Sequence, residues 1–175
     1  MTIHLVLGGA RSGKSSFAES EVLASDKLYR HYIATATSTD DEMQRRIDHH
    51  QARRDSDWRL HEIPIEIAAH LGSFSDNDVV LVDCLTLWMS NVIFEHGETA
   101  SEAAINQRVA KLIEALKCCR ADVVLVSNEV GLGVVPMGEV SRLFVDHAGW
   151  MNQAIAKVSD RVTFVAAGLP LTMKG

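Results

Sequence analysis

The sequence predicts an α/β fold in which a mostly parallel central sheet carries helices on both faces. Short apolar segments without polar alternation recur along the chain, as is typical of strands buried on both sides. Segments with helical periodicity separate them, which favours parallel strands joined by crossover helices. No internal repeat, low-complexity segment or long linker divides the 175 residues, so we expect a single domain spanning residues 1–175.

The predicted strands are short, and the fifth is expected to be the last one of the chain. They cover residues 3–7, 32–34, 79–82, 123–126 and 162–166.

The predicted helices cover residues 14–24, 40–54, 85–94, 99–117 and 140–158. The segment 99–117 is the most clearly amphipathic of them, and Thr99 or Ser101 is expected to cap it. The stretch from about 40 to 71 is expected to form a helical excursion outside the central sheet.

Composition and charge exclude several classes of function. The formal net charge of −6 argues against a general nucleic-acid binder. No apolar run approaches the length of a membrane span, and the N-terminal residues lead directly into a strand pattern. The three cysteines fit neither a disulfide framework nor a zinc site, and we expect them to be reduced. We therefore expect a cytoplasmic protein without membrane insertion and without a nucleic-acid partner.

A phosphate-binding motif follows the first predicted strand and opens the first predicted helix. It matches the pattern G-x-x-x-x-G-K-[ST] in full and consists of Gly8, Gly9, Ala10, Arg11, Ser12, Gly13, Lys14 and Ser15. Glycines let the backbone turn tightly, so that successive N–H groups point at phosphate oxygens. Lys14 is expected to reach the β- and γ-phosphates, and the Ser15 hydroxyl to bind Mg²⁺. This motif in this context predicts a fold of the P-loop NTPase type.

The ends of two other predicted strands carry polar side chains. Asp83 directly follows the segment 79–82, and we favour a role on the Mg²⁺ ion over capping of the next helix. Asn128 and Glu129 follow the segment 123–126, where either a turn or cap role or a site role fits.

The predicted helix at 40–54 carries a histidine pair among arginines. At about 100° per residue, His50 lies beside the apolar stripe of this helix and His49 lies on the opposite side. Arginines stand one helical turn before and after His50, at positions 46, 53 and 54. A neutral imidazole among guanidinium groups can attack a phosphorus atom while they hold the phosphate oxygens. Composition alone, however, favours a solvated helix face with an incidental histidine pair.

These segments together resemble the bifunctional adenosylcobinamide kinase and adenosylcobinamide-phosphate guanylyltransferase family. The resemblance covers nearly the whole chain in the same order. It rests on the phosphate motif at 8–15, Tyr-Ile-Ala-Thr at 32–35, Asp-Glu-Met at 41–43, Arg-Ile at 46–47 followed by His-His at 49–50, Trp-Arg at 58–59, Asp-Cys-Leu-Thr-Leu-Trp at 83–88, Asn-Glu-Val-Gly at 128–131, and Gly149 with Asn-Gln at 152–153.

The resemblance implies two reactions in cobalamin biosynthesis. A nucleoside triphosphate, ATP or GTP, phosphorylates the hydroxyl on the aminopropanol arm of adenosylcobinamide. GTP then transfers GMP to a histidine, which falls on His50 here, and the GMP passes to adenosylcobinamide phosphate to give adenosylcobinamide-GDP. The implied nucleotide contacts beyond the phosphate motif are Thr35, Ala36, Thr37, Gln51, Ala52, Arg53, Arg54, Glu62 and Asp83. Members of the family are homotrimers, so Arg54 or His50 can act across a subunit boundary.

Two other functions compete with this interpretation. A P-loop kinase of a small metabolite would share the phosphate motif, and His50 would then be incidental. A regulatory GTP-binding module would need the guanine-reading sequence Asn-Lys-x-Asp, which is absent. Residues 146–149 fit the letters D-x-x-G of such modules, but they fall in a late helical segment rather than at a strand end.

Overall fold

The structure, a computed structural model, describes residues 1–36, 57–95, 97 and 99–175. The strands of this part of the chain are β1 (Ile3–Gly8), β2 (Tyr29–Ala34), β3 (Trp58–Glu62), β4 (Asp78–Asp83), β5 (Asp122–Asn128), β6 (Arg161–Ala166) and β7 (Leu169–Lys174). The helices are α1 (Lys14–Leu23), α3 (Ile67–Leu71), α4 (Leu85–Ile93), α5 (Glu102–Cys118) and α6 (Glu139–Val158).

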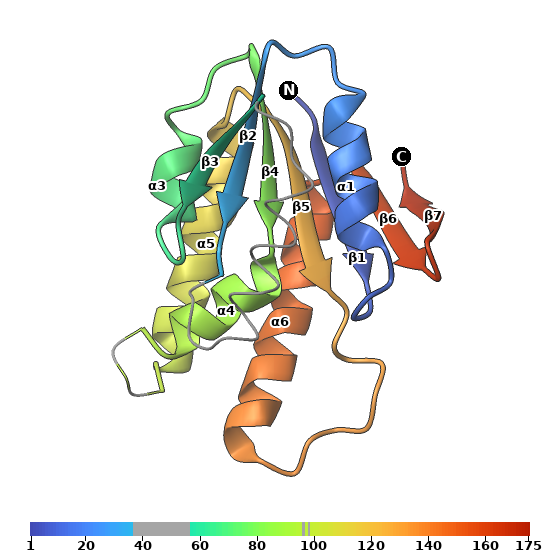
Figure 1. Cartoon of the computed structure of the whole chain (residues 1–175). Helices are drawn as coiled ribbons and strands as arrows, with labels where there is room; N and C mark the ends of the chain where they lie inside the picture. The colour runs from blue at the N-terminus through green and yellow to red at the C-terminus, as the bar shows by residue number, and fades with distance from the viewer. Residues whose placement is uncertain (37–56, 96, 98) are drawn as a thin grey trace.

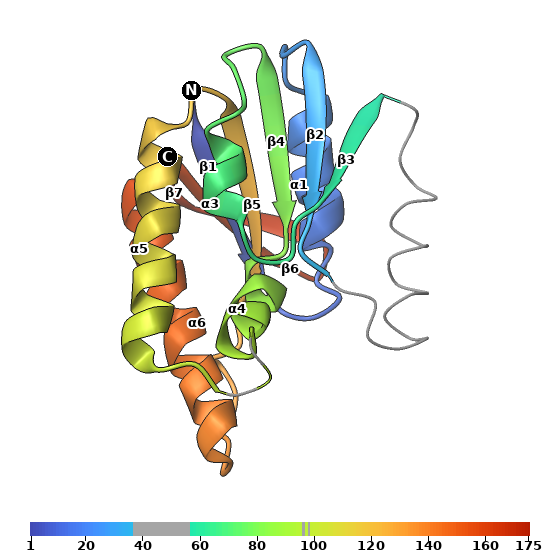
Figure 2. The ribbon, with the colours of Figure 1, turned by 90° about the vertical axis from the view of Figure 1, so that its left-hand side faces the viewer.

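The strands form one sheet in the order β3-β2-β4-β5-β1-β6-β7 (Figure 1). All neighbouring strands in it are parallel except the β6–β7 pair, which is an antiparallel hairpin. Helix α1 covers one face, and α3, α5 and α6 lie on the other (Figure 2). The predicted α/β class with a mostly parallel sheet is confirmed.

Two cores hold these layers together, one on each face of the sheet. The larger joins the sheet to α3, α4, α5 and α6, and it includes Leu5, Val80 and the fully buried Trp88. The smaller joins the sheet to α1 through Ala18 and Val22. The central strands β1, β4 and β5 are buried almost throughout, which explains why each reads as an unbroken apolar run.

Two strands correct the predictions, and both are edge strands. β3 pairs in parallel with β2, so residues 58–62 belong to the sheet and are not part of an excursion outside it. β7 follows the strand that we expected to be the last. Every residue of β7 is exposed, and β3 reads Trp-Arg-Leu-His-Glu. β3 therefore shows no apolar run. β7 reads Leu-Pro-Leu-Thr-Met-Lys, and the proline inside it is typical of an edge strand and not of a buried central one.

The expected cap of α5 is confirmed. Ser101 precedes α5, and its side-chain oxygen accepts a hydrogen bond from the backbone N–H of Ala104 at 3.3 Å, so Ser101 and not Thr99 caps this helix. The three cysteines are free thiols. None of the helices in the described ranges combines the length and the apolar character that a membrane span requires.

Candidate nucleotide-binding site

The phosphate motif forms the turn between β1 and α1, at the edge of the sheet where the parallel strands end. Gly13 is the residue before α1 and adopts a left-handed φ of 93°. The turn closes through a hydrogen bond of 3.3 Å from the N–H of Ser12 to the carbonyl of Gly9. α1 then begins with the N–H of Phe17 donating to the carbonyl of Gly13 at 3.0 Å. The N-terminal end of a helix therefore faces the space that phosphates would occupy.

Neighbouring turns hold this loop from two sides. On one side, the N–H of Glu129 donates to the carbonyl of Gly8 at 3.1 Å. On the other, the N–H of Gly168, in the β6–β7 turn, donates to the carbonyl of Ser12 at 2.8 Å. The loop is thus anchored by the backbone of the segments that follow β5 and β6.

Two glycines of the motif are required by close packing. A Cβ on Gly8 would lie 2.5 Å from the carbonyl oxygen of Val165, which belongs to the neighbouring strand β6. A Cβ on Gly13 would lie 3.1 Å from the Cα of Gly168, in addition to the strain of its positive φ. A Cβ on Gly9 would have no atom within 4 Å, so packing does not require a glycine at this position.

Lys14 and Ser15 occupy the first turn of α1. The Lys14 side chain is buried, and its Nζ donates to the carbonyl of Gly9 at 3.1 Å, so the ammonium group folds back over the loop. Ser15 is half-buried beside it. A positive charge over a cradle of N–H groups is the arrangement that stabilises a polyphosphate.

Asp83 ends β4, on the same edge of the sheet as the phosphate loop. Its Oδ2 accepts a hydrogen bond of 3.0 Å from the hydroxyl of Tyr32. The residue preceding α4 is Cys84, and it has a non-helical backbone, so Asp83 does not cap that helix. This excludes the capping alternative and leaves the carboxylate at a strand end where α/β sheets bind ligands.

The Thr35 side chain has a structural role. It is fully buried, and its hydroxyl donates to the carbonyl of Cys84 at 2.7 Å and accepts from the N–H of Cys84 at 2.8 Å. The amide of Asn91 donates to the Thr35 carbonyl at 2.8 Å. Thr35 thus fixes the junction of β4 and α4 next to Asp83. Its hydroxyl has both a donor and an acceptor partner within the described part of the chain.

Cys84 packs in the core, as its context predicted. Its Sγ lies 3.2 Å from the hydroxyl oxygen of Thr86, and burial raises the pKa of its thiol, with the Asp83 charge adding to the effect. A thiol held in the neutral form is a poor nucleophile.

A polar network that the sequence did not reveal lies beside the phosphate loop. Asn128 is aligned with Gly8 across the β5–β1 pair, and its amide donates to the hydroxyl of Thr86 at 2.8 Å. The amide of Asn152, on α6, donates to the Asn128 carbonyl at 3.3 Å. Asn128 therefore links the loop to α4 and α6. The polar strand end was the only local signal for this network, because Thr86 and Asn152 come from helices far away in the sequence.

The other predicted site residues are not brought together by the described part of the chain. Glu62 is exposed at the end of β3, and Ala36 is half-buried beyond β2. His50, Thr37, Gln51, Ala52, Arg53 and Arg54 lie outside the described residues.

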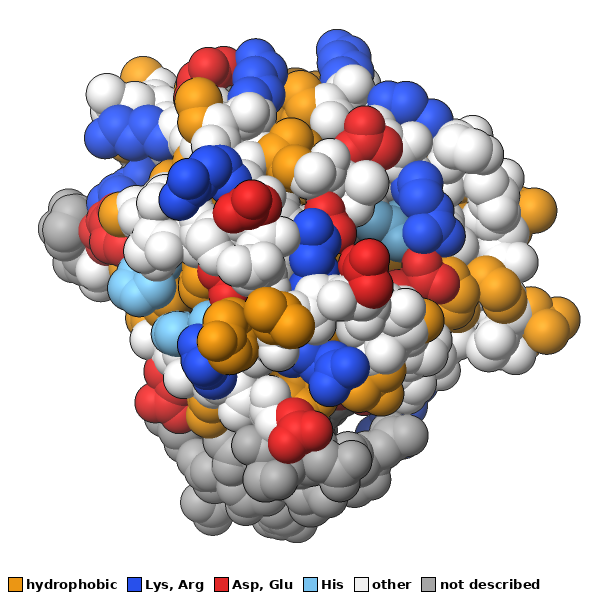
Figure 3. Space-filling model, turned by 90° about the horizontal axis from the view of Figure 1, so that it is seen from above, with side chains coloured by type: hydrophobic (Ala, Val, Ile, Leu, Met, Phe, Trp, Pro, Cys, Tyr) orange, Lys and Arg blue, Asp and Glu red, His pale blue; other side chains and the backbone are white. Residues whose placement is uncertain are grey.

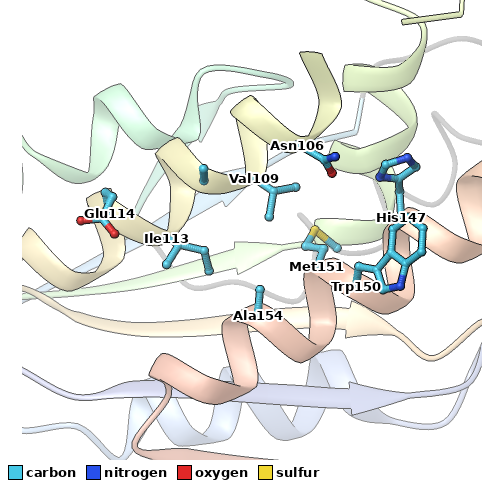
Figure 4. A pocket seen from close by; sticks show the side chains of 9 residues that line it. Asn106, Val109, Ile113, Glu114, His147, Trp150, Met151 and Ala154 are labelled. Atoms are coloured by element: carbon cyan, nitrogen blue, oxygen red, sulfur yellow. The ribbon is translucent and has the colours of Figure 1, made fainter. Parts of the chain in front are cut away.

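A groove of about 370 Å³ lies between α5 and α6 (Figure 4), and none of its lining residues belongs to the phosphate loop. It is lined mostly by apolar side chains, together with Glu114, His147 and Trp150. Its described lining contains no lysine or arginine, so it offers no countercharge to a triphosphate.

The fold and the anchored phosphate loop define a nucleotide-binding protein of the P-loop class. Solved structures share this fold. One is an ATPase of the type III secretion system of pathogenic bacteria (TM-score 0.58, 9% identity, covering 98% of this chain and 56% of that one). Another is the flagellar accessory protein FlaH of Methanocaldococcus jannaschii (TM-score 0.54, 12% identity, covering 99% and 78%). At these identities the likeness concerns the fold alone.

The chain belongs to the family described as cobinamide kinase / cobinamide phosphate guanyltransferase, whose model matches residues 4–173. It is 49% identical over 172 residues to the bifunctional adenosylcobalamin biosynthesis protein CobP of Pseudomonas aeruginosa, covering 98% of this chain and 96% of that protein. It is 40% identical over 184 residues to the bifunctional protein CobU of Escherichia coli K12, covering 97% and 98%. The resemblance noted from the sequence is thereby confirmed.

Proposed function

We propose that this protein is a bifunctional transferase that phosphorylates adenosylcobinamide. It then transfers GMP from GTP to the adenosylcobinamide phosphate formed in the first reaction. The product is adenosylcobinamide-GDP, an intermediate of cobalamin assembly. The observation that carries the proposal is the anchored phosphate loop with Lys14 and Asp83 on the same edge of the sheet, in a chain of this family. Residues 1–175 act as one domain in this proposal.

The kinase half is a transfer of the γ-phosphoryl group. The acceptor hydroxyl of adenosylcobinamide attacks the γ-phosphorus, the bond to the bridging oxygen breaks, and the nucleoside diphosphate leaves. The hydroxyl proton passes to solvent. The N–H groups of residues 8–15 bind the phosphate oxygens, and the Lys14 ammonium offsets the negative charge that grows on the leaving group.

Mg²⁺ fits this site by the chemistry of its donors. The Ser15 hydroxyl and the Asp83 carboxylate offer oxygen atoms, the ligand type that this cation takes. Mg²⁺ would shield the phosphate charges there. Tyr32 orients the Asp83 carboxylate through the bond to Oδ2, so in this proposal Tyr32 is a positioning residue for the metal ligand.

The guanylyltransferase half uses His50 as the nucleophile. A ring nitrogen of His50 attacks the α-phosphorus of GTP, the bond to the β-phosphate oxygen breaks, and pyrophosphate leaves. A phosphate oxygen of adenosylcobinamide phosphate then attacks the same phosphorus and releases His50. Arg53 and Arg54 bind the phosphate oxygens, and Thr37, Gln51 and Ala52 belong to the nucleotide contacts that the family resemblance implies. In this proposal the enzyme is a homotrimer in the cytoplasm.

The corrinoid product tests this function. The purified protein is incubated with adenosylcobinamide, Mg²⁺ and GTP, with and without ATP, and the corrinoid is separated and weighed by mass spectrometry. We expect a phosphate adduct and then a GDP adduct, and neither with Lys14→Ala. A phosphate adduct that never gains GMP would instead support the kinase without nucleotidyl transfer. An unmodified corrinoid with the wild-type protein would contradict the proposal.

A further inference from the structure

The connection between β5 and α6 exposes an unusual number of apolar side chains. Leu132 is 79% exposed, Val134 97% and Met137 96%, and Val135 is exposed as well. Residues 130–138 contain no charged side chain, in a chain whose formal net charge is −6. Soluble proteins rarely expose such a contiguous apolar segment unless it binds something.

Polar contacts anchor both ends of this loop and leave the apolar side chains facing outward. At its start, the Glu129 carboxylate accepts a hydrogen bond of 2.9 Å from the N–H of Gly131. At its end, the Arg142 guanidinium donates to the carbonyls of Pro136 and Met137. Hydrogen bonds to the backbone therefore hold this loop, and none of these bonds involves its apolar side chains.

The connection between β5 and α6 starts next to the phosphate loop. The N–H of Glu129 donates to the carbonyl of Gly8 at 3.1 Å, and Asn128 is aligned with Gly8 in the sheet. From there the loop descends from the carboxyl edge of the sheet to the start of α6, on the side where β1 meets α1 (Figure 1). The opposite end of the molecule is different, because acidic and basic side chains are interspersed there (Figure 3).

We propose that the apolar loop 132–137 is the surface on which the corrin ring of the acceptor lies. This inference rests on the proposed function. The acceptor hydroxyl is carried on an arm of a large macrocycle, so when the hydroxyl reaches the phosphate loop, the ring lies beside that loop. The periphery of a corrin ring carries methyl groups and uncharged amides. Exposed aliphatic side chains without charge bind such a surface by excluding water from it.

A second copy of the chain is the other occupant that such a surface could take. The substrate is favoured because the loop is continuous with the phosphate cradle through Glu129 and Gly8. The two possibilities predict different effects of a substitution in this loop. If the loop binds the corrin ring, corrinoid binding weakens; if it binds a second copy of the chain, the oligomeric state changes.

The test is a pair of substitutions that remove apolar surface without adding charge. Val134→Ser with Met137→Ser is compared with Leu28→Ser, which removes a leucine of 70% exposure from the connection between α1 and β2. Three quantities are measured: the Kd for adenosylcobinamide by equilibrium dialysis, the KM for GTP, and the sedimentation coefficient. All three side chains are exposed, so the variants are expected to fold, and a thermal melt checks this.

We expect the loop variant to raise the Kd for adenosylcobinamide about tenfold or more, equivalent to about 1.4 kcal/mol. Its KM for GTP and its sedimentation coefficient should stay at the wild-type values, as should all three quantities in Leu28→Ser. An unchanged Kd in the loop variant overturns the inference while the proposed function stands. A smaller sedimentation coefficient would assign the loop to a subunit contact instead. If the wild-type protein itself fails to bind adenosylcobinamide, the proposed function fails together with the inference.

Discussion

The backbone N–H of Gly168 donates to the carbonyl of Ser12 at 2.8 Å, so the last hairpin of the chain braces the phosphate loop. The two residues are separated by almost the whole sequence. The β6–β7 turn approaches so closely that a Cβ on Gly13 would meet the Cα of Gly168 at 3.1 Å. The edge hairpin is therefore part of the support of the candidate site, even though every residue of β7 is exposed.

The turn of this hairpin provides a pair of substitutions with opposite expected signs. Ala167 and Gly168 have φ values of 52° and 79°. Gly168→Ala meets no atom within 4 Å, so it adds only the left-handed strain of about 1–2 kcal/mol and lowers the free energy of unfolding. Ala167→Gly removes a similar strain at an entropic cost of about 0.4–1 kcal/mol, so we expect a small gain in stability. Urea unfolding of both variants checks this, and a destabilised Ala167→Gly variant would contradict it.

Adjacent glycines of the phosphate loop should respond very differently to the same substitution. Gly8→Ala forces the neighbouring strand to move, because its Cβ would lie 2.5 Å from the carbonyl oxygen of Val165. We expect a loss of about 1–3 kcal/mol in the free energy of unfolding without nucleotide. Gly9→Ala is the matched control, since nothing lies within 4 Å of its Cβ, and it should change stability by less than about 0.5 kcal/mol. Equal losses in the two variants would show that packing does not distinguish them.

Asp83 and Tyr32 are expected to differ in their effect on activity. Asp83→Asn removes the charge proposed to bind Mg²⁺, and we expect kcat/KM to fall on the order of 100-fold. Tyr32→Phe removes one hydrogen bond to the carboxylate, and we expect a fall of about tenfold or less. Activity is measured over a series of Mg²⁺ concentrations. A wild-type Mg²⁺ dependence in Asp83→Asn would assign Asp83 a purely structural role.

The buried His4 predicts a loss of stability on mild acidification. Its Nε2 lies 2.9 Å from the Thr163 hydroxyl, and burial together with the Arg161 charge lowers the pKa of the imidazole below its usual 6.5. Well above pH 6.5 the imidazole is neutral in both the folded and unfolded states, and its contribution to stability is full. As the pH falls through this value, the unfolded chain binds the proton first, so the free energy of unfolding decreases until the lower folded pKa is reached.

His4→Gln should reduce this pH dependence, because it removes one of the groups that titrate differently in the two states. The measurement is the free energy of unfolding between pH 5 and 7.5 for both proteins. The pKa of His61 is also lowered, first by burial and then by His31. Part of the pH dependence of the free energy of unfolding should therefore remain in the variant. A variant with the same slope as the wild type would show that His4 does not contribute.

The central strands and the phosphate loop could be predicted from the sequence, and the edges of the sheet could not. β1, β4 and β5 are buried on both faces, so nearly all of their residues are apolar and each strand appears in the sequence as an apolar run. β3 is partly solvated and contains Arg, His and Glu, and β7 is exposed throughout and contains a proline, so neither reads as a buried strand. The family resemblance implies Thr35 as a nucleotide contact, and nothing in the sequence indicates that its hydroxyl bonds to the backbone of Cys84. That contact joins residues far apart in sequence, and no local pattern encodes it.

The proposed guanylyl transfer depends on His50 as the residue that carries GMP, and one measurement tests this role. The protein is mixed with Mg²⁺ and GTP without corrinoid, and its intact mass is recorded for the wild type, His50→Ala and His49→Ala. We expect an acid-labile increase of the size of GMP in the wild type and His49→Ala, and none in His50→Ala. A wild-type protein that binds GTP without gaining mass, or a His50→Ala variant that still gains it, would contradict the proposed mechanism.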